Sequence, residues 1–272
     1  TGGQNCMVVD SSALLEQVVT DAIASAFEAA GQRCSALRVL CVQGDVADRL
    51  VEMLQGAMAE IRMGAPAHLA VDVGPVIDER ARAGIEAHVS AMQQGGCPVH
   101  RISANGLNTL PAGTYVQPTL IEIDSIAQLE REVFGPVLHI VRYDRSDLPD
   151  LLHSINDTGY ALTLGVHSRI EETIAQVIDH THAGNVYVNR NMVGAVVGVQ
   201  PFGGEGLSGT GPKAGGPLYL LRLLASCPQD AALRSVQASG AAALPQPTPA
   251  LQALHDWAVA QGRLPLAHAS AQ

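Results

Sequence analysis

Short apolar runs alternate with amphipathic segments along most of this chain, and this alternation restricts the possible fold more than any other feature. The apolar runs are typical of buried strands and lie at 6–9, 37–42, 115–123, 137–143, 162–166 and 185–189. The segments between them repeat apolar residues at helical spacing, at 15–30, 46–61, 78–94, 148–156 and 171–182. Because parallel strands need crossovers of helical length, we predict an α/β fold with a mainly parallel sheet flanked by helices.

Composition and charge exclude several classes of function. The 272 residues include 16 Lys and Arg against 26 Asp and Glu, a formal net charge of −10, whereas a nucleic-acid-binding surface is basic. The sequence has no run of about 18 apolar residues that could span a membrane and no signal-peptide pattern. Its five cysteines form no C-x-x-C pair, which favours reduced thiols and argues against a zinc site. We expect a cytoplasmic protein with a small-molecule substrate, no nucleic-acid partner and no metal.

The character of the sequence changes in its last third. Nine glycines with interleaved prolines lie within 194–217, a composition typical of an ordered loop that approaches a ligand closely. After Pro228 the chain is rich in Ala and Pro, as in a linker, and a short helix is expected near 251–261. We therefore divide the chain into a folded domain at 1–228 and, at 229–272, a linker with the start of a C-terminal extension.

Cys34 is the candidate nucleophile. It follows the end of a predicted helix, precedes a predicted buried strand and has Arg33 beside it. A neighbouring cation favours the thiolate, the form that attacks a carbonyl carbon. A structural thiol is the alternative, because spacing alone does not separate the two. No His–carboxylate pattern accompanies Cys34, so a cysteine-dependent acyl hydrolase has little support.

Six short motifs occur in a fixed order along residues 1–227, and together they are far more specific than any one of them. They are TGGQN at 1–5, GQRC at 31–34, GPVI at 74–77, EVFGP at 132–136, GNVYVN at 184–189 and PFGG at 201–204. In this order and at this spacing they resemble the aldehyde dehydrogenase superfamily. A narrower pattern, CSALR at 34–38 with PFGGEGLSGTGPKAGGP at 201–217, resembles the L-glutamate γ-semialdehyde (1-pyrroline-5-carboxylate) dehydrogenase domains of bifunctional PutA proteins.

The resemblance implies NAD-dependent oxidation of L-glutamate γ-semialdehyde to glutamate in proline catabolism. It implies that the Cys34 thiolate attacks the aldehyde carbon, while the Cys34 N–H and an Asn side chain hold the oxyanion. Hydride then passes to NAD⁺, and a Glu activates the water that hydrolyses the thioester. The general-base Glu, the Asn and most of the Rossmann NAD domain belong to family segments before residue 1, so we expect a fragment that is inactive alone.

The resemblance also assigns binding roles. It implies that Glu132 hydrogen-bonds the nicotinamide ribose and that Phe134 packs beside the nicotinamide. Ser35 and the backbone N–H groups of Gly215 and Gly216 would hold the substrate carboxylate, because successive N–H groups at glycines can form an anion-binding nest.

Three further expectations concern the parent protein and the alternatives. The resemblance implies a parent that forms homo-oligomers and can carry a second, FAD-dependent proline dehydrogenase domain. One alternative is a dehydrogenase for another semialdehyde, because the glycine nest favours a carboxylate without setting the substrate's length. The other alternative is a non-catalytic fragment or assembly module.

Overall fold

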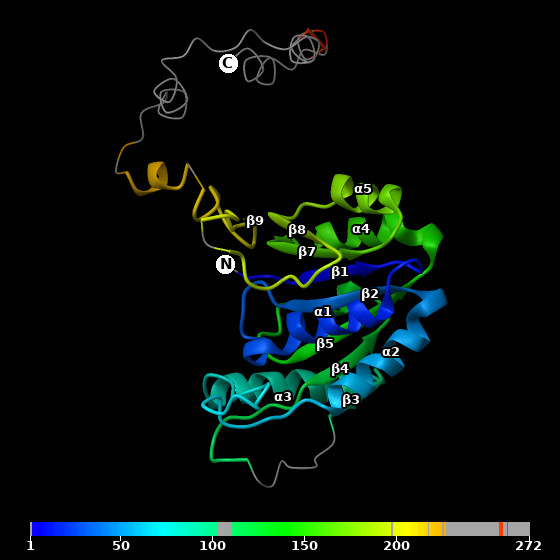
Figure 1. Ribbon diagram of the computed structural model, residues 1–272, viewed down its shortest axis with the longest axis vertical. Helices are drawn as coiled ribbons and strands as arrows, with labels where there is room; N and C mark the ends of the chain where they lie inside the picture. The colour runs from blue at the N-terminus through cyan, green and yellow to red at the C-terminus, as the bar shows by residue number, and fades with distance from the viewer. Residues whose placement is uncertain are drawn as a thin grey trace. The chain divides into compact units, whose positions relative to one another are not determined.

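A seven-stranded sheet organises the larger part of the molecule (Figure 1). The computed structural model describes residues 2–102, 110–196, 198–216, 218–224, 226, 256–257 and 260. They fall into two units, Thr1–Tyr219 and Leu220–Gln272, and the sheet lies in the first, with strand order β3-β4-β5-β2-β1-β7-β8. All its neighbouring strands are parallel except β3 and β4. The predicted fold class is confirmed.

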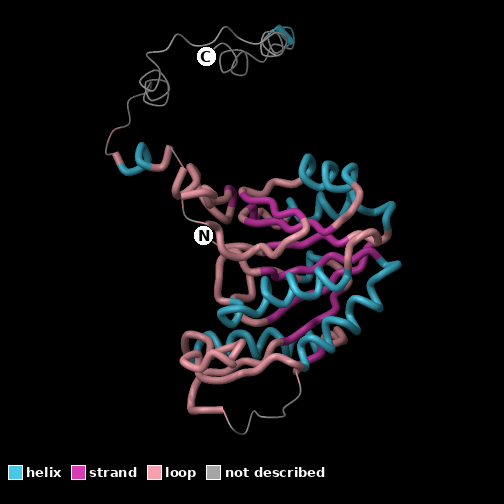
Figure 2. The backbone as a smooth tube through the Cα atoms, in the orientation of Figure 1, coloured by secondary structure: helices cyan, strands magenta, loops and turns pink. Residues whose placement is uncertain are grey.

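The elements follow the alternation of the sequence (Figure 2). The strands of the main sheet are β1 (Asn5–Val9), β2 (Leu37–Gln43), β3 (Val99–Arg101), β4 (Thr119–Ile123), β5 (Val137–Tyr143), β7 (Thr163–His167) and β8 (Asn185–Val188). The helices are α1 (Leu15–Phe27), α2 (Gly44–Ala59), α3 (Glu79–Gln94), α4 (Leu148–Asp157) and α5 (Glu171–His180). Among the described residues no helix is long and apolar enough to cross a membrane.

Shorter elements complete the structure. Strands β6 (Tyr160–Ala161) and β9 (Glu205–Gly206) form a two-stranded antiparallel sheet. Single 3₁₀ turns are η1 (Glu28–Gly31), η3 (Ile126–Gln128), η4 (Arg145–Asp147) and, in the second unit, η5 (Leu220–Leu223). Most of the helix expected near 251–261 lies outside the described residues.

Two differences from the expected strands lie at one edge of the sheet. The strand expected at 115–123 is confined to Thr119–Ile123, because Pro118 has no N–H to give to a ladder. The antiparallel strand β3 was not expected, since its three residues are too short for a periodic pattern.

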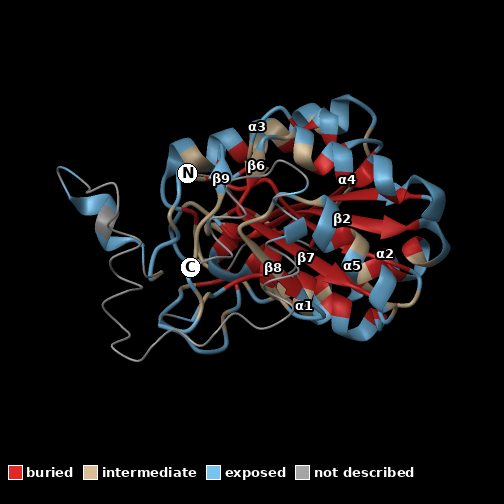
Figure 3. Ribbon diagram, turned by 90° about the horizontal axis from the view of Figure 1, so that it is seen from above, coloured by how far each residue is buried: buried red, intermediate tan, exposed pale blue. Residues whose placement is uncertain are grey.

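Helices cover both faces of the sheet, and the alternation of side chains along β5 shows how. Arg142 bonds Asp48 on α2, whereas His139, three residues earlier, bonds His88 on α3. Residues an odd number apart point to opposite faces of a strand, so α2 and α3 lie on opposite faces. Helix α1 packs beside α2 against β2 and β5. Strands β1 and β2 are completely buried between these layers (Figure 3), as expected of central parallel strands.

Asp10 joins two strands at the carboxyl end of the sheet. Its Oδ1 accepts hydrogen bonds from the Ser12 N–H and hydroxyl at 2.8 and 2.6 Å, and its Oδ2 accepts one from the Ser168 hydroxyl at 2.6 Å. Helix α1 begins only at Leu15, so the Asp10 carboxylate does not cap it and instead links the end of β1 to the end of β7.

His139 is a buried titratable group of the sheet's core, with 1% of its surface exposed. Its Nδ1 lies 3.0 Å from the Arg38 carbonyl and its Nε2 lies 2.9 Å from Nε2 of His88. A carbonyl can only accept, so Nδ1 of His139 donates, its Nε2 accepts and His88 donates. Burial, with the charges of His88 and Arg38, lowers the pKa of His139 to about 3.

We therefore predict that His139 makes the fold acid-sensitive. Between about pH 6.5 and pH 3 the unfolded chain binds a proton here that the folded chain does not, so the free energy of unfolding falls as pH falls. The effect is at most about 1.4 kcal/mol per pH unit. Denaturant unfolding from pH 8 to pH 5 should give a shallower pH dependence for His139→Gln than for the wild type. The exposed His68→Gln is the control, and an equal slope in all three proteins would contradict the prediction.

Candidate active site

Three segments that are distant in sequence meet at the amino ends of neighbouring strands. Residues 2–4 precede β1, residues 31–36 precede β2 and residues 132–136 precede β5. Since β5, β2 and β1 are adjacent and parallel, the segments that enter them lie side by side. Figure 2 shows these loops at the end of the sheet where the chain begins.

Hydrogen bonds to its backbone carbonyls hold the turn that carries Cys34, while Cys34 itself is exposed. The Asn5 amide donates to the carbonyls of Cys34 and Ala36 at 2.7 and 2.9 Å. The Asn5 Oδ1 accepts from the Thr163 N–H at 3.1 Å, so one side chain links β1, β2 and β7. Asn5 is 3% exposed, and the sequence analysis gave it no role.

A left-handed turn precedes Cys34. Ala29, Ala30 and Gly31 have φ values of 53°, 53° and 64°, whereas the predicted helix includes Ala29 and Ala30. Left-handed backbone costs an L-residue about 1–2 kcal/mol, so neighbouring contacts must hold this turn. Gly31 is required for a second reason: a Cβ there would collide with the Gly135 carbonyl.

Cys34, Ser35 and Gly215 line one cavity of about 620 Å³. Its other lining residues are Gln32, Arg33, Gly194, Ala195, Gly198, Gln200, Phe202 and Ala214. Gly215 has a φ of 74°, a conformation that glycine adopts without strain. Gly216 is the next residue, and its N–H donates to the Lys213 carbonyl at 3.0 Å. The structure thus brings the predicted nucleophile together with two of the three residues predicted for the carboxylate.

Glu132 and Phe134 line a separate cavity of about 480 Å³ beside α3. Glu132 Oε2 accepts from the Gly3 N–H at 3.0 Å, and its Oε1 accepts from Arg38 at 3.0 and 3.3 Å. Phe134 is 44% exposed, and its ring centroid lies 5.2 Å from the guanidinium carbon of Arg38. An exposed aromatic ring and a fixed carboxylate thus lie next to the segment that carries Cys34.

Arg38 joins these parts, and the sequence analysis missed it. Its side chain is 1% exposed and donates to the carbonyls of Gly31, Gly135 and Arg33 at 2.7, 3.1 and 3.1 Å. Burial lowers the pKa of Arg38, while the charges of Glu132 and Cys34 act in the opposite direction. The available signal was a charged residue inside an otherwise apolar run predicted to be a buried strand.

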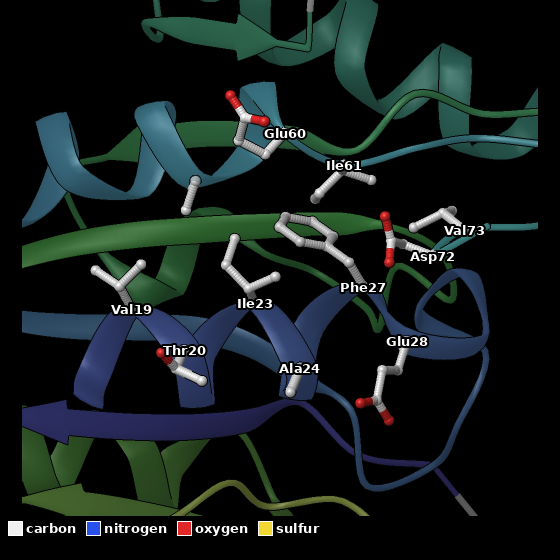
Figure 4. A pocket seen from close by; sticks show the side chains of 11 residues that line it. Val19, Thr20, Ile23, Ala24, Phe27, Glu28, Glu60, Ile61, Asp72 and Val73 are labelled. Atoms are coloured by element: carbon white, nitrogen blue, oxygen red, sulfur yellow. The ribbon is translucent and has the colours of Figure 1, made fainter. Parts of the chain in front are cut away.

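A third cavity, of about 580 Å³, lies between α1 and α2 (Figure 4). Phe27 and Ile23 form its apolar floor, and the carboxylates of Glu28, Glu60 and Asp72 surround them. The described residues that line it include none of those predicted for chemistry.

The comparisons with known proteins agree with this geometry. The model of the aldehyde dehydrogenase family matches residues 1–225. The chain belongs to the aldehyde dehydrogenase family.

Relatives of this aldehyde dehydrogenase chain include PutA proteins. The bifunctional protein PutA of Escherichia coli K12 is 60% identical over 270 residues, which cover 95% of this chain and 20% of PutA. A crystal structure of Bradyrhizobium japonicum PutA is 54% identical with a TM-score of 0.77, over 81% of this chain and 22% of that one. A Thermus 1-pyrroline-5-carboxylate dehydrogenase solved with bound NAD is 31% identical with a TM-score of 0.72, over 81% and 42%. The chain thus spans about a fifth of the PutA proteins it matches.

We predict that Cys34 is the most reactive described thiol of this aldehyde dehydrogenase chain. Cys6 and Cys41 are buried and Cys97 is half-buried, so a thiol reagent should reach Cys34 first. Brief treatment of the native protein with iodoacetamide, followed by peptide mass spectrometry, should find Cys34 modified before these three. Preferential modification of Cys97 would contradict the assignment of the nucleophile.

Asn5→Ala should lower stability by about 2–4 kcal/mol, because it removes the side-chain partner of the Cys34 carbonyl, the buried Ala36 carbonyl and the buried Thr163 N–H. Urea unfolding measures the loss, and the exposed Gln93→Ala is the control. The same variant should change the rate of Cys34 alkylation, since Asn5 holds the Cys34 carbonyl. A loss below about 0.5 kcal/mol, as for ordinary surface substitutions, would show that Asn5 does not hold the turn.

Proposed function

We propose that this chain carries the nucleophile of an NAD-dependent L-glutamate γ-semialdehyde dehydrogenase that acts in proline catabolism. One observation carries the proposal: the exposed Cys34 thiol shares a cavity with Ser35 and Gly215. The names of the relatives, PutA and 1-pyrroline-5-carboxylate dehydrogenase, support the same substrate.

Cys34 supplies the covalent chemistry. Its thiolate attacks the aldehyde carbon, a C–S bond forms and the carbonyl oxygen becomes an oxyanion, to which the Cys34 N–H and an Asn side chain donate. NAD⁺, when bound, accepts the hydride that leaves this carbon. The product on Cys34 is a thioester, and water activated by a Glu hydrolyses it to the carboxylate and the free thiol. The roles of the Asn and the Glu are implied by the resemblance, and we assign neither role to a residue of this chain.

The opposite end of the substrate carries a carboxylate, and Ser35 with Gly215 provides donors for it. Ser35 is 6% exposed, so a charge-assisted hydrogen bond from its hydroxyl would be poorly screened by water. The cavity is otherwise mainly apolar, which suits the methylene groups between the two ends of the substrate. Gly216 remains part of the proposed nest, although its N–H bonds Lys213 in this conformation.

The residues of the second cavity fit the nicotinamide ribose of NAD. Each oxygen of a carboxylate can accept more than one hydrogen bond, so Glu132 can receive ribose hydroxyls while it keeps Gly3 and Arg38. The exposed Phe134 ring offers an apolar surface to a flat heterocycle. Glu132 and Phe134 would hold the cofactor next to the segment that carries Cys34.

Several proposals concern the complete protein. We place the end of the catalytic domain near residue 228, with a C-terminal extension after it. We propose a cytoplasmic homo-oligomer, in which a separate domain can hold FAD. There are two alternatives: a dehydrogenase for another semialdehyde and a non-catalytic assembly module. The following experiment distinguishes both from the proposed function.

We expect the protein expressed from its complete reading frame to reduce NAD⁺ with L-glutamate γ-semialdehyde, followed by NADH absorbance. Cys34→Ala should abolish turnover, whereas Cys97→Ala should leave it near the wild type. Ser35→Ala should raise KM about tenfold for the semialdehyde, by loss of one hydrogen bond to a charged group, and leave KM for propanal unchanged. An equal effect on both aldehydes would contradict carboxylate recognition by Ser35. Turnover of a shorter or longer semialdehyde alone would favour the other dehydrogenase, and no turnover of any semialdehyde by the wild type would favour the assembly module.

A further inference from the structure

We propose that Arg38 is a positioning residue that holds the Cys34 turn and the Glu132–Phe134 loop at one fixed separation, and thereby sets the affinity of the site for the nicotinamide cofactor. The inference rests on the proposed function, because it assigns the cofactor to Glu132 and Phe134. Arg38 itself touches neither substrate nor cofactor in this account.

The hydrogen bonds of Arg38 use every donor that a guanidinium has. Its Nε and Nη2 donate to Glu132 Oε1, its Nη1 donates to the Gly31 and Gly135 carbonyls, and its Nη2 also donates to the Arg33 carbonyl. A guanidinium carries five N–H groups in a rigid plane, and these five bonds match them. Two of the acceptors belong to the segment that carries Cys34, and the others belong to the loop that carries Glu132 and Phe134.

Burial makes this arrangement demanding. The Arg38 side chain is 1% exposed and that of Glu132 is 13% exposed, so the guanidinium has almost no access to water and depends on its protein acceptors. Removal of one member of a buried pair leaves the other uncompensated. A lysine keeps the charge but has three donors and no planar fork, so it cannot hold both segments at once.

The strained turn beside Cys34 adds a second reason for this arrangement. Ala29, Ala30 and Gly31 hold left-handed backbone, and Arg38 binds the carbonyl at the end of that turn. Arg38 also lies against the Phe134 ring. One side chain therefore restrains the turn before the nucleophile, the carboxylate proposed for the ribose and the ring proposed for the nicotinamide.

A change at Arg38 should therefore affect the affinity for the cofactor and the affinity for the aldehyde to different extents. Ser35 and Gly215, proposed for the substrate carboxylate, make none of their described hydrogen bonds to Arg38. Replacing the fork should therefore weaken cofactor binding more than aldehyde binding, because the proposed cofactor residues Glu132 and Phe134 contact Arg38 directly. A residue with a merely structural role would lower the amount of folded enzyme and change neither KM.

We expect Arg38→Lys, made in the complete protein, to raise both the Kd for NADH and the KM for NAD⁺ at least about tenfold. This factor corresponds to the loss of one charge-assisted hydrogen bond, that of a misplaced Glu132 to the ribose. Titration calorimetry measures the Kd. The KM for the semialdehyde should rise by a clearly smaller factor than the KM for NAD⁺. Arg142→Lys is the matched control, because Arg142 also bonds two carboxylates, those of Asp48 and Glu122, on the surface. Unchanged cofactor affinity in Arg38→Lys, or an equal change in Arg142→Lys, would overturn the proposal.

A double-mutant cycle tests the route through the carboxylate. Glu132→Gln should weaken NADH binding, and adding Arg38→Lys to it should weaken binding further by less than about twofold, since residues that act through one another are not additive. Fully additive losses would show that Arg38 does not act through Glu132.

A second measurement does not need a variant at Arg38. Glu132→Asp shortens the carboxylate by one methylene, so amide hydrogen exchange should become faster at residues 31–36 without any ligand, while Glu130→Asp should leave it unchanged. Unchanged exchange at 31–36 in Glu132→Asp would overturn the coupling even if Arg38→Lys does not fold. Absence of turnover or of NADH binding in the wild type would contradict the proposed function instead, because this exchange measurement requires neither.

Discussion

The site depends on the parallel pairing of four neighbouring strands. Strands β5, β2, β1 and β7 run in the same direction, so their amino ends, and the loops that enter them, must lie at the same end of the sheet. Ligands of open α/β sheets commonly bind at the carboxyl ends of the strands, whereas here the proposed nucleophile, Cys34, lies at the amino ends. The carboxyl ends are used differently, since Asp10 and Ser168 join β1 to β7 there.

An ion pair between the buried Arg38 and the largely buried Glu132 lies at this end of the sheet. Burying charges is costly, and replacing such a pair by apolar residues of similar volume is often neutral or stabilising. The Arg38–Glu132 pair is therefore better explained by the positioning of the site's segments than by a gain in stability. It connects residues 94 positions apart in the sequence and restrains a left-handed turn. His139 extends the same network, because its Nδ1 donates to the Arg38 carbonyl, while its Nε2 must stay unprotonated to accept from His88.

Much of the fold could be predicted from periodicity. The strand expected at 137–143 and the helix expected at 78–94 agree with the structure to within one residue, since each has a continuous apolar pattern. The failures have local causes: Pro118 shortens one strand, β3 is too short to show a period, and the chain turns left-handed at Ala29 although its helical pattern continues. Periodicity indicates which side chains are buried, but it does not predict a backbone conformation that only tertiary contacts can hold.

The sequence by itself determined the α/β alternation, the ordered motifs and the identity of Cys34 as the candidate nucleophile, because these depend on residue type and on spacing along the chain. Only the tertiary structure decided that Cys34 is exposed, that it shares a cavity with Ser35 and Gly215, and that Arg38 and Asn5 hold its turn. Those facts depend on which strands are neighbours and in which direction they run. Strand order is set by packing between segments far apart in the chain, and no local pattern encodes it.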